Sequence, residues 1–213
     1  NALLSIFLIV AAYHFGKEDT VFSFKKRLVS EILFFLKGSP VIISPLLFQR
    51  EATNEIFKLL NFNIFELPVF SDQLLIIFLI LSFFSSIYIS SSKNLDIKMI
   101  MIVDFLSLLI LNFFLTPVLA FTIYFCFLHS IRHAITLIFE LDNSFEKGLG
   151  KFAIRAIPLT IITMVIFLVA IYSLNNFFML DEAIYKVIFI GLASLTFPHI
   201  LLEYLLEKNE KRT

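Results

Sequence analysis

Long apolar runs dominate the chain, and the most extensive cover residues 73–89, 97–115 and 157–174. A helix needs about 20 mostly apolar residues to cross the hydrocarbon core of a bilayer. Only helices and closed β-barrels satisfy every backbone hydrogen bond in lipid, and barrel strands alternate in polarity, which these runs do not. Hydrophobic residues make up 59% of the sequence, more than the roughly 45–50% of soluble domains. The sequence therefore predicts an all-α fold, a polytopic transmembrane helical bundle of about six to seven spans.

Charged residues and turn signals mark the ends of the predicted spans. The shortest, Ser39–Phe48, contains two prolines and is also compatible with a re-entrant loop. No internal repeat or linker divides the chain, so we expect residues 1–213 to form a single transmembrane helical domain. Because the sequence opens inside an apolar run, we also expect a further helix upstream. The predicted spans are Asn1–Phe15, Ser39–Phe48, Asp72–Ile89, Asp96–Leu115, Pro117–Phe139, Phe152–Leu174 and Glu182–Leu206.

The distribution of basic residues predicts the orientation. If the spans alternate, Arg50, Lys58 and Lys186 lie on one side, Arg132 lies within a span, and all other Lys and Arg residues lie on the opposite side. Basic residues accumulate on the cytoplasmic side of membrane proteins, so we expect a multi-pass protein with a cytoplasmic C-terminus. The 17 basic and 17 acidic residues balance, which argues against a nucleic-acid partner.

All four histidines of the chain, His14, His129, His133 and His199, fall inside predicted spans and at a similar depth. A lone membrane histidine is often a hydrogen-bonded packing residue, but ionisable residues in spans are usually functional. His129 and His133 are four residues apart, which places both rings on one face of an α-helix, where they can share an ion. Imidazole suits iron, zinc, copper and nickel. The pattern predicts a histidine-ligated metal site within the membrane.

Four polar residues near this layer are candidates to support the ligands. Metal-bound histidines usually donate their second N–H to a carboxylate, and Asp104 is the first candidate, although a hydrogen bond to a neighbouring helix would also explain it. Glu203 follows His199 by four residues, but Glu203 and Asp19 can also be solvated helix ends. Arg132 can anchor a polar group or extend to the lipid headgroups.

Three segments of the chain resemble motifs of the Brp/Blh family of bacterial β-carotene-cleaving enzymes, in the family's order. They are YHFGKED at residues 13–19, HSIRH at residues 129–133 and FPHILLE at residues 197–203. By this resemblance His14, His129 and His133 correspond to iron ligands of the family, and His199 corresponds to a further family histidine. The family also has a histidine in an earlier segment, upstream of the first residue given.

The resemblance implies an Fe(II)-dependent β-carotene 15,15'-dioxygenase in a bacterial cell membrane. Such an enzyme uses O₂ to cleave the central double bond of β-carotene into two retinal molecules, and a rhodopsin is the expected consumer of the retinal. One alternative is a non-catalytic carotenoid- or retinal-binding accessory protein for rhodopsin assembly, which needs no metal. Another is a metal-ion transporter, which would be expected to spread polar residues across the membrane and to show repeats. These features are absent from the sequence.

Overall fold

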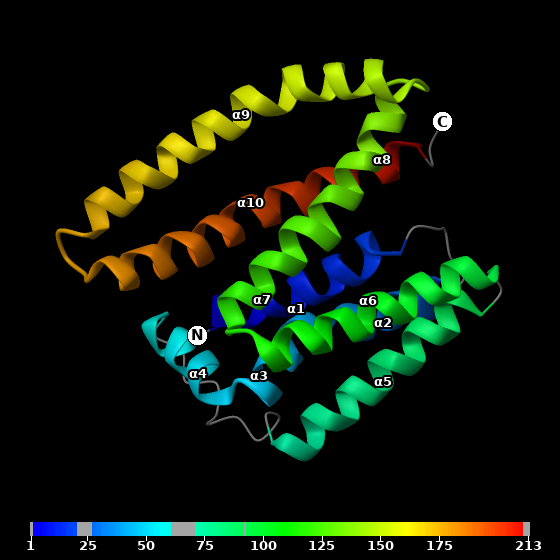
Figure 1. Ribbon diagram of the computed structural model, residues 1–213, viewed down its shortest axis with the longest axis horizontal. Coiled ribbons are helices and arrows are strands. Elements are labelled where there is room, and N and C mark those ends of the chain that lie inside the picture. The colour runs from blue at the N-terminus through cyan, green and yellow to red at the C-terminus, as the bar shows by residue number, and fades with distance from the viewer. Residues whose placement is uncertain (1, 21–26, 61–70, 92, 211–213) are drawn as a thin grey trace. The chain divides into compact units, whose positions relative to one another are not determined.

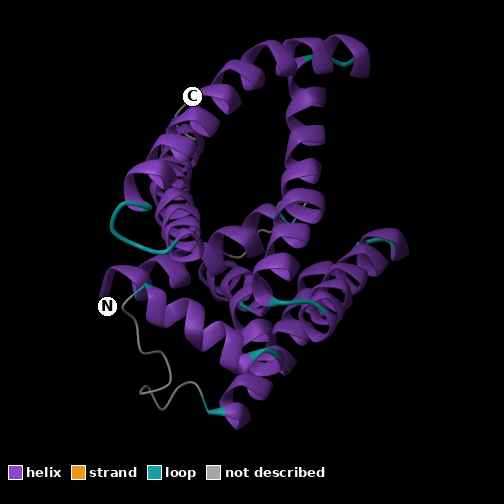
Figure 2. Cartoon of the chain, turned by 60° about the vertical axis from the view of Figure 1, so that its left-hand side comes forward, coloured by secondary structure: helices purple, strands orange, loops and turns teal. Residues whose placement is uncertain are grey.

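A computed structural model describes residues 2–20, 27–60, 71–91 and 93–210, with side chains placed in residues 5–20, 29–60, 71–91 and 93–196. All regular structure in these ranges is helical, and no strand occurs there (Figure 2). The chain divides into two compact units, residues 1–134 and 135–213. The helices, labelled in Figure 1, are α1 (Ala2–Glu18), α2 (Arg27–Gly38), α3 (Pro40–Phe48), α4 (Arg50–Leu59), α5 (Asp72–Ser90), α6 (Leu95–Phe114), α7 (Pro117–Ile123), the π-helix η3 (Tyr124–Ser130), α8 (Ile131–Leu141), α9 (Phe145–Leu174) and α10 (Leu180–Glu210).

Among the described residues, five helical segments are long and apolar enough to cross a membrane. Because lipid offers no partner for backbone N–H and C=O groups, such helices are stable spanning elements. The predicted all-α membrane fold is therefore confirmed, and α10 covers the region predicted as the last span. The five segments are Val29–Phe48, Asp72–Ser90, Leu95–Phe114, Pro117–Leu141 and Phe145–Leu174.

The segment predicted as the short span Ser39–Phe48 begins ten residues earlier. α2 runs directly into α3, and together they form the 20-residue candidate span Val29–Phe48. The break at Pro40 follows from its missing N–H group, which cannot continue the hydrogen bonding of α2. As a consequence Lys37, which the charge pattern placed in a loop, lies inside a candidate span.

The first two helices cross with their backbones almost in contact. A Cβ atom added to Gly16 of α1 would lie 1.8 Å from the Phe34 carbonyl oxygen, and one added to Gly38 of α2 would lie 1.9 Å from the Ala12 carbonyl oxygen. Small residues at a crossing allow this approach, because helices in lipid associate through close packing rather than through a hydrophobic driving force. The crossing brings the end of α2 to the end of α1.

Serine residues line the face of α5 that packs inside unit 1. Ser82, Ser85, Ser86 and Ser90 are all buried, and their spacing places them along one side of the helix. Ser85 Oγ donates a hydrogen bond to the Leu33 carbonyl oxygen of α2, with a length of 2.7 Å. Small hydroxyl side chains thus attach α5 to α2 in the manner typical of transmembrane helices.

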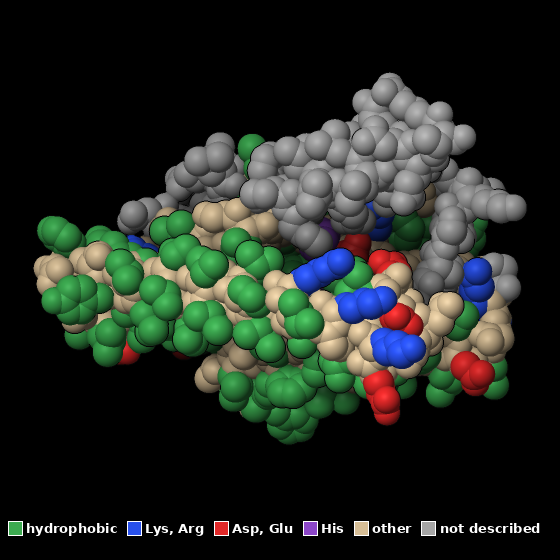
Figure 3. Space-filling view, turned by 90° about the horizontal axis from the view of Figure 1, so that it is seen from above, with side chains coloured by type: hydrophobic (Ala, Val, Ile, Leu, Met, Phe, Trp, Pro, Cys, Tyr) green, Lys and Arg blue, Asp and Glu red, His purple; other side chains and the backbone are tan. Residues whose placement is uncertain are grey.

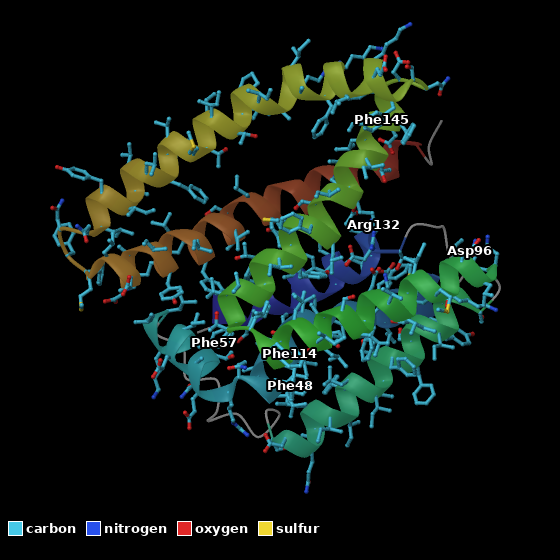
Figure 4. The ribbon with its side chains drawn as sticks, viewed as in Figure 1. Phe48, Phe57, Asp96, Phe114, Arg132 and Phe145 are labelled. Atoms are coloured by element: carbon cyan, nitrogen blue, oxygen red, sulfur yellow. The ribbon has the colours of Figure 1, made fainter. Side chains whose placement is uncertain are left out.

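Two apolar clusters complete the core of unit 1. One joins α3, α4 and α5. The other joins α1, α3, α6 and η3, and its members include Phe15 and Tyr124. At the far ends of α3 and α6, Phe48 packs edge-to-face on Phe113, with ring centroids 5.8 Å apart, next to Phe114 (Figure 4). The buried cluster members are Ile43, Leu46, Phe57, Leu75 and Leu79 in the first, and Ala11, Phe15, Val41, Leu108 and Tyr124 in the second.

In unit 2, α9 and α10 form a helical hairpin. Gly191 of α10 accommodates the Phe167 ring of α9, since an added Cβ atom would lie 2.3 Å from its nearest carbon. Hydrophobic side chains cover most of the visible face of α9, and Lys, Arg, Asp and Glu side chains gather towards its N-terminal end (Figure 3). An apolar helix surface with charges at one end fits a lipid-facing span whose end reaches the headgroups.

Candidate metal centre

Two of the four histidines meet inside unit 1. His14, near the end of α1, and His129, in η3, have ring centroids 5.8 Å apart in an edge-on arrangement. Both residues are buried, with 5% and 8% of their surface exposed. The rings of Phe15 and Phe125 flank His129, at centroid distances of 5.0 and 5.6 Å. Aromatic packing therefore holds one imidazole beside another in an apolar setting.

Asp19 accepts two hydrogen bonds from η3. Its Oδ1 lies 3.0 Å from His129 Nδ1, and its Oδ2 lies 2.5 Å from the Tyr124 hydroxyl oxygen, which donates. Tyr124 and His129 are five residues apart, a spacing that an α-helix turns by about 140° away from a common face. A π-helix instead bonds residue i to residue i+5, and such segments are frequent at functional sites. The local π-helix thus points both side chains at one carboxylate.

A second carboxylate on α1 faces His133. Glu18 Oε2 lies 3.3 Å from His133 Nδ1. Because Glu18 and Asp19 are consecutive, the end of α1 presents one acid to each histidine of the HSIRH segment. In both imidazoles the nitrogen facing the acid is Nδ1, so Nε2 is directed elsewhere.

Arg132 and Asp104 form a two-pronged ion pair between α8 and α6. Arg132 Nη1 donates to Asp104 Oδ2 at 2.8 Å, and Nη2 donates to Oδ1 at 2.7 Å. The side chains are 25% and 19% exposed, so the pair is largely withdrawn from solvent (Arg132 is labelled in Figure 4). Two parallel bonds make this the strongest kind of arginine–carboxylate contact. Asp104 thus pairs with a residue of a neighbouring helix, which was the alternative to a histidine partner.

A small polar cavity of about 30 Å³ lies beside these groups. Asp19, Lys37, Ser86, Asp104 and Tyr124 contribute the polar part of its wall. A space of this size with several polar neighbours can hold a water molecule. Lys37 Nζ also donates to Thr20 Oγ1, at 3.0 Å. Lys37 and Arg132 carry two positive charges that match the two negative charges of Asp19 and Asp104.

The ionisation of Asp19 follows from these neighbours. Burial raises the pKa of this carboxyl, but the hydrogen bond from His129 and the positive charge of Lys37 lower it by more, so the pKa lies below its ordinary value. The carboxylate is therefore ionised at neutral pH and can only accept hydrogen bonds. A hydrogen bond to this carboxylate needs a proton on His129 Nδ1, so a neutral His129 would have its lone pair on Nε2.

The predicted site residues divide into two groups. The structure gathers His14, His129, His133, Asp104 and Arg132 in unit 1. His199 and Glu203 lie on α10 in unit 2, where their side chains fall outside the described residues. Within the described part of the chain, no three His, Cys, Asp or Glu side chains already stand close enough to hold an ion. The histidine ligand set stays a prediction.

Sequence reasoning missed the contributions of Glu18, Tyr124 and Lys37, and placed Asp19 near the histidine layer without assigning it a partner. Asp19 and Glu18 belong to the YHFGKED segment, so their place beside a motif histidine was the one signal available. No sequence signal pointed to Tyr124, because a tyrosine in an apolar run usually packs with its hydroxyl bound locally. The five-residue spacing to His129 has meaning only in a π-helix.

Fold and site together define a polytopic helical membrane protein in which two buried histidines meet and one of them contacts a carboxylate. A family model described as "Beta-carotene 15,15'-dioxygenase" matches residues 2–207. The chain belongs to this family and is accordingly an oxidoreductase. It is also 30% identical over 214 residues to the β-carotene 15,15'-dioxygenase of uncultured marine bacterium 66A03, covering 98% of the chain and 74% of that relative. No solved structure matches the chain.

Proposed function

We propose that the chain binds Fe(II) through His14, His129 and His133 and uses O₂ to cleave the central double bond of β-carotene into two retinal molecules. The observation that carries the proposal is the meeting of His14 and His129 rings, 5.8 Å apart, in a buried layer. The family membership supplies the substrate and the bond that is cleaved. The resemblance of the histidine segments to the family's motifs supports the ligand assignment.

The chemistry of the donor set fits iron. Imidazole nitrogen is a ligand that iron accepts readily, and the acids facing the Nδ1 atoms of His129 and His133 are the partners that metal-bound histidines usually have. Bound there, Fe(II) would supply the one-electron chemistry through which O₂ reacts with an alkene. The chain's own part is to hold the nitrogen donors, orient them and exclude water.

The reaction balances without a proton donor or an added reductant. One carbon–carbon double bond is broken, each of its carbons gains a double bond to oxygen, and both oxygen atoms come from one O₂ molecule. Asp19 and Glu18 therefore need not transfer protons during the reaction. Their supporting role would be to orient the histidines and balance charge.

Coexpression in a β-carotene-producing bacterium tests the proposal. The chain should bleach the orange cells and produce retinal, measured by chromatography of the extract. His129→Ala and His133→Ala should abolish retinal formation while the protein still inserts in the membrane, and Asp142→Asn, in an exposed ion pair with Lys151, should behave as the parent. Retinal formation undiminished in both histidine variants would refute the ligand assignment. A carotene-binding protein without iron, with carotene unchanged, would instead indicate the accessory protein.

The proposal also includes the predicted domain organisation, membrane topology, fourth histidine and consumer of the product. Residues 1–213 would act as one membrane domain in a bacterial cell membrane, with a cytoplasmic C-terminus that reporter fusions after Thr213 can test. His199, on α10, stays a predicted ligand, and a His199→Ala variant would show whether iron binding needs it. The consumer of the retinal that we predict is a rhodopsin.

A further inference from the structure

The end of α1 and the π-helix η3 enclose one carboxylate between a tyrosine and a histidine. Asp19 uses both of its oxygens, one towards His129 Nδ1 at 3.0 Å and the other towards the Tyr124 hydroxyl at 2.5 Å. The side chains of His129 and Asp19 are only 10% and 14% exposed. Water therefore has little access to either bond, and a hydrogen bond to a charged group gains strength where water is excluded.

The aromatic neighbours leave His129 little freedom. The Phe125 ring stacks on the imidazole with planes 25° apart, and the Phe15 ring meets it edge-on. Such packing restrains the tilt of the ring, but a rotation by 180° would still exchange the two nitrogens. Only a directional partner decides which nitrogen faces inward, and in the described structure Asp19 is that partner.

Tyr124 in turn fixes the orientation of the Asp19 carboxylate. Its hydroxyl occupies Asp19 Oδ2, which leaves Oδ1 for the imidazole. Because η3 spaces its hydrogen bonds by five residues, Tyr124 and His129 reach the same carboxylate from one helix face. The π-helix is thus the local feature that makes the three-residue arrangement geometrically available.

We infer that Asp19, held by Tyr124 across the π-helix, is the positioning residue that orients His129 and presents its Nε2 atom for metal binding. The inference rests on the proposed iron site and adds to it a residue that does not itself touch the metal. Glu18 Oε2 lies 3.3 Å from His133 Nδ1, so an acid also stands beside the second histidine of the HSIRH segment. The YHFGKED segment thereby provides both a histidine and the acids that support the two histidines of the HSIRH segment.

The test measures metal affinity, separately from activity. Purified protein in detergent is titrated anaerobically with Fe(II), and with Co(II), whose visible absorption reports the number and kind of ligands. Asp19→Asn should weaken binding of both ions by about 10- to 100-fold and change the Co(II) spectrum. Tyr124→Phe should weaken binding by about tenfold, because the acid is kept but loses one restraint. Asp142→Asn is the control and should bind as the parent does.

The outcomes separate this inference from the proposed function. If His129→Ala abolishes binding while Asp19→Asn and Tyr124→Phe bind within twofold of the parent, the positioning role is refuted and the iron site stands. If His129→Ala also binds normally, the ligand assignment itself fails. Should Asp19→Asn not accumulate in the membrane, Tyr124→Phe decides, since unchanged affinity and an unchanged Co(II) spectrum in that variant would overturn the inference.

Discussion

Gly16 on α1 and Gly38 on α2 lie so close that a Cβ atom added to Gly38 would stand 2.5 Å from the Gly16 backbone nitrogen. No side chain fits between the helices at this point. The contact fixes where α2 ends relative to α1, and it brings Lys37 within hydrogen-bonding distance of Thr20, just beyond the end of α1. Gly16 of the YHFGKED segment therefore affects the site by letting the backbones of α1 and α2 approach each other.

The first prediction follows from this contact. Gly16→Ala and Gly38→Ala should each lower the free energy of unfolding by about 1–3 kcal/mol, because backbone atoms must move apart. Unfolding in mixed detergent micelles measures the change. Gly150→Ala is the matched control, since an added Cβ atom there meets nothing within 4 Å, and it should stabilise the helix by about 0.5–1 kcal/mol. A parent-like midpoint for Gly16→Ala would contradict the described crossing.

The second prediction concerns the pair of Arg132 and Asp104. Removing one partner leaves the other charge largely buried, so Arg132→Ala and Asp104→Ala should each cost about 3 kcal/mol of stability. The double variant should cost clearly less than the two single changes together, because no unpaired charge remains. Asp72→Ala, which breaks the exposed pair with Arg50, should change stability by less than about 1 kcal/mol. Strictly additive effects in the cycle would show that the pair is not formed.

The third prediction tests the π-helix. Deleting Phe127, an exposed residue between Tyr124 and His129, makes these two residues four apart, a spacing that an α-helix places on one face. The deletion variant should therefore retain Fe(II) binding. Deleting Leu119, equally an exposed residue but in the regular helix α7, should abolish binding, because it rotates the following residues by about 100°. Loss of binding in both variants would argue against the register described for η3.

The fourth prediction concerns removal of the metal. A ligand that binds only the folded state stabilises it by about 2.7 kcal/mol at a concentration 100 times its dissociation constant. Chelation of iron should accordingly lower the melting temperature of the purified protein, and added Fe(II) should restore it. His14→Ala should abolish this metal-dependent shift. A melting temperature that responds to iron in His14→Ala as in the parent would exclude His14 from the ligands.

The sequence was sufficient to predict the helical membrane class and the extents of α5 and α6, because long apolar runs determine a span almost by themselves. It was insufficient for α2, where Glu31 and Lys37 interrupt the apolar pattern and Lys37 finds its hydrogen-bond partner, Thr20, outside the helix. Motif spacing indicated the histidines. It could not indicate that Asp19 pairs with a residue 110 positions later, because that contact exists only once the helices have packed.

The three charged groups that line the small cavity and Arg132, the partner of Asp104, have a consequence for engineering and for natural variation. Lys37, Arg132, Asp19 and Asp104 sum to zero, and in a medium that solvates ions poorly any single loss creates an uncompensated charge. Substitutions here should therefore succeed in opposite-sign pairs and fail alone. A designer who wishes to alter the surroundings of His129 should exchange an acid and a base in the same step.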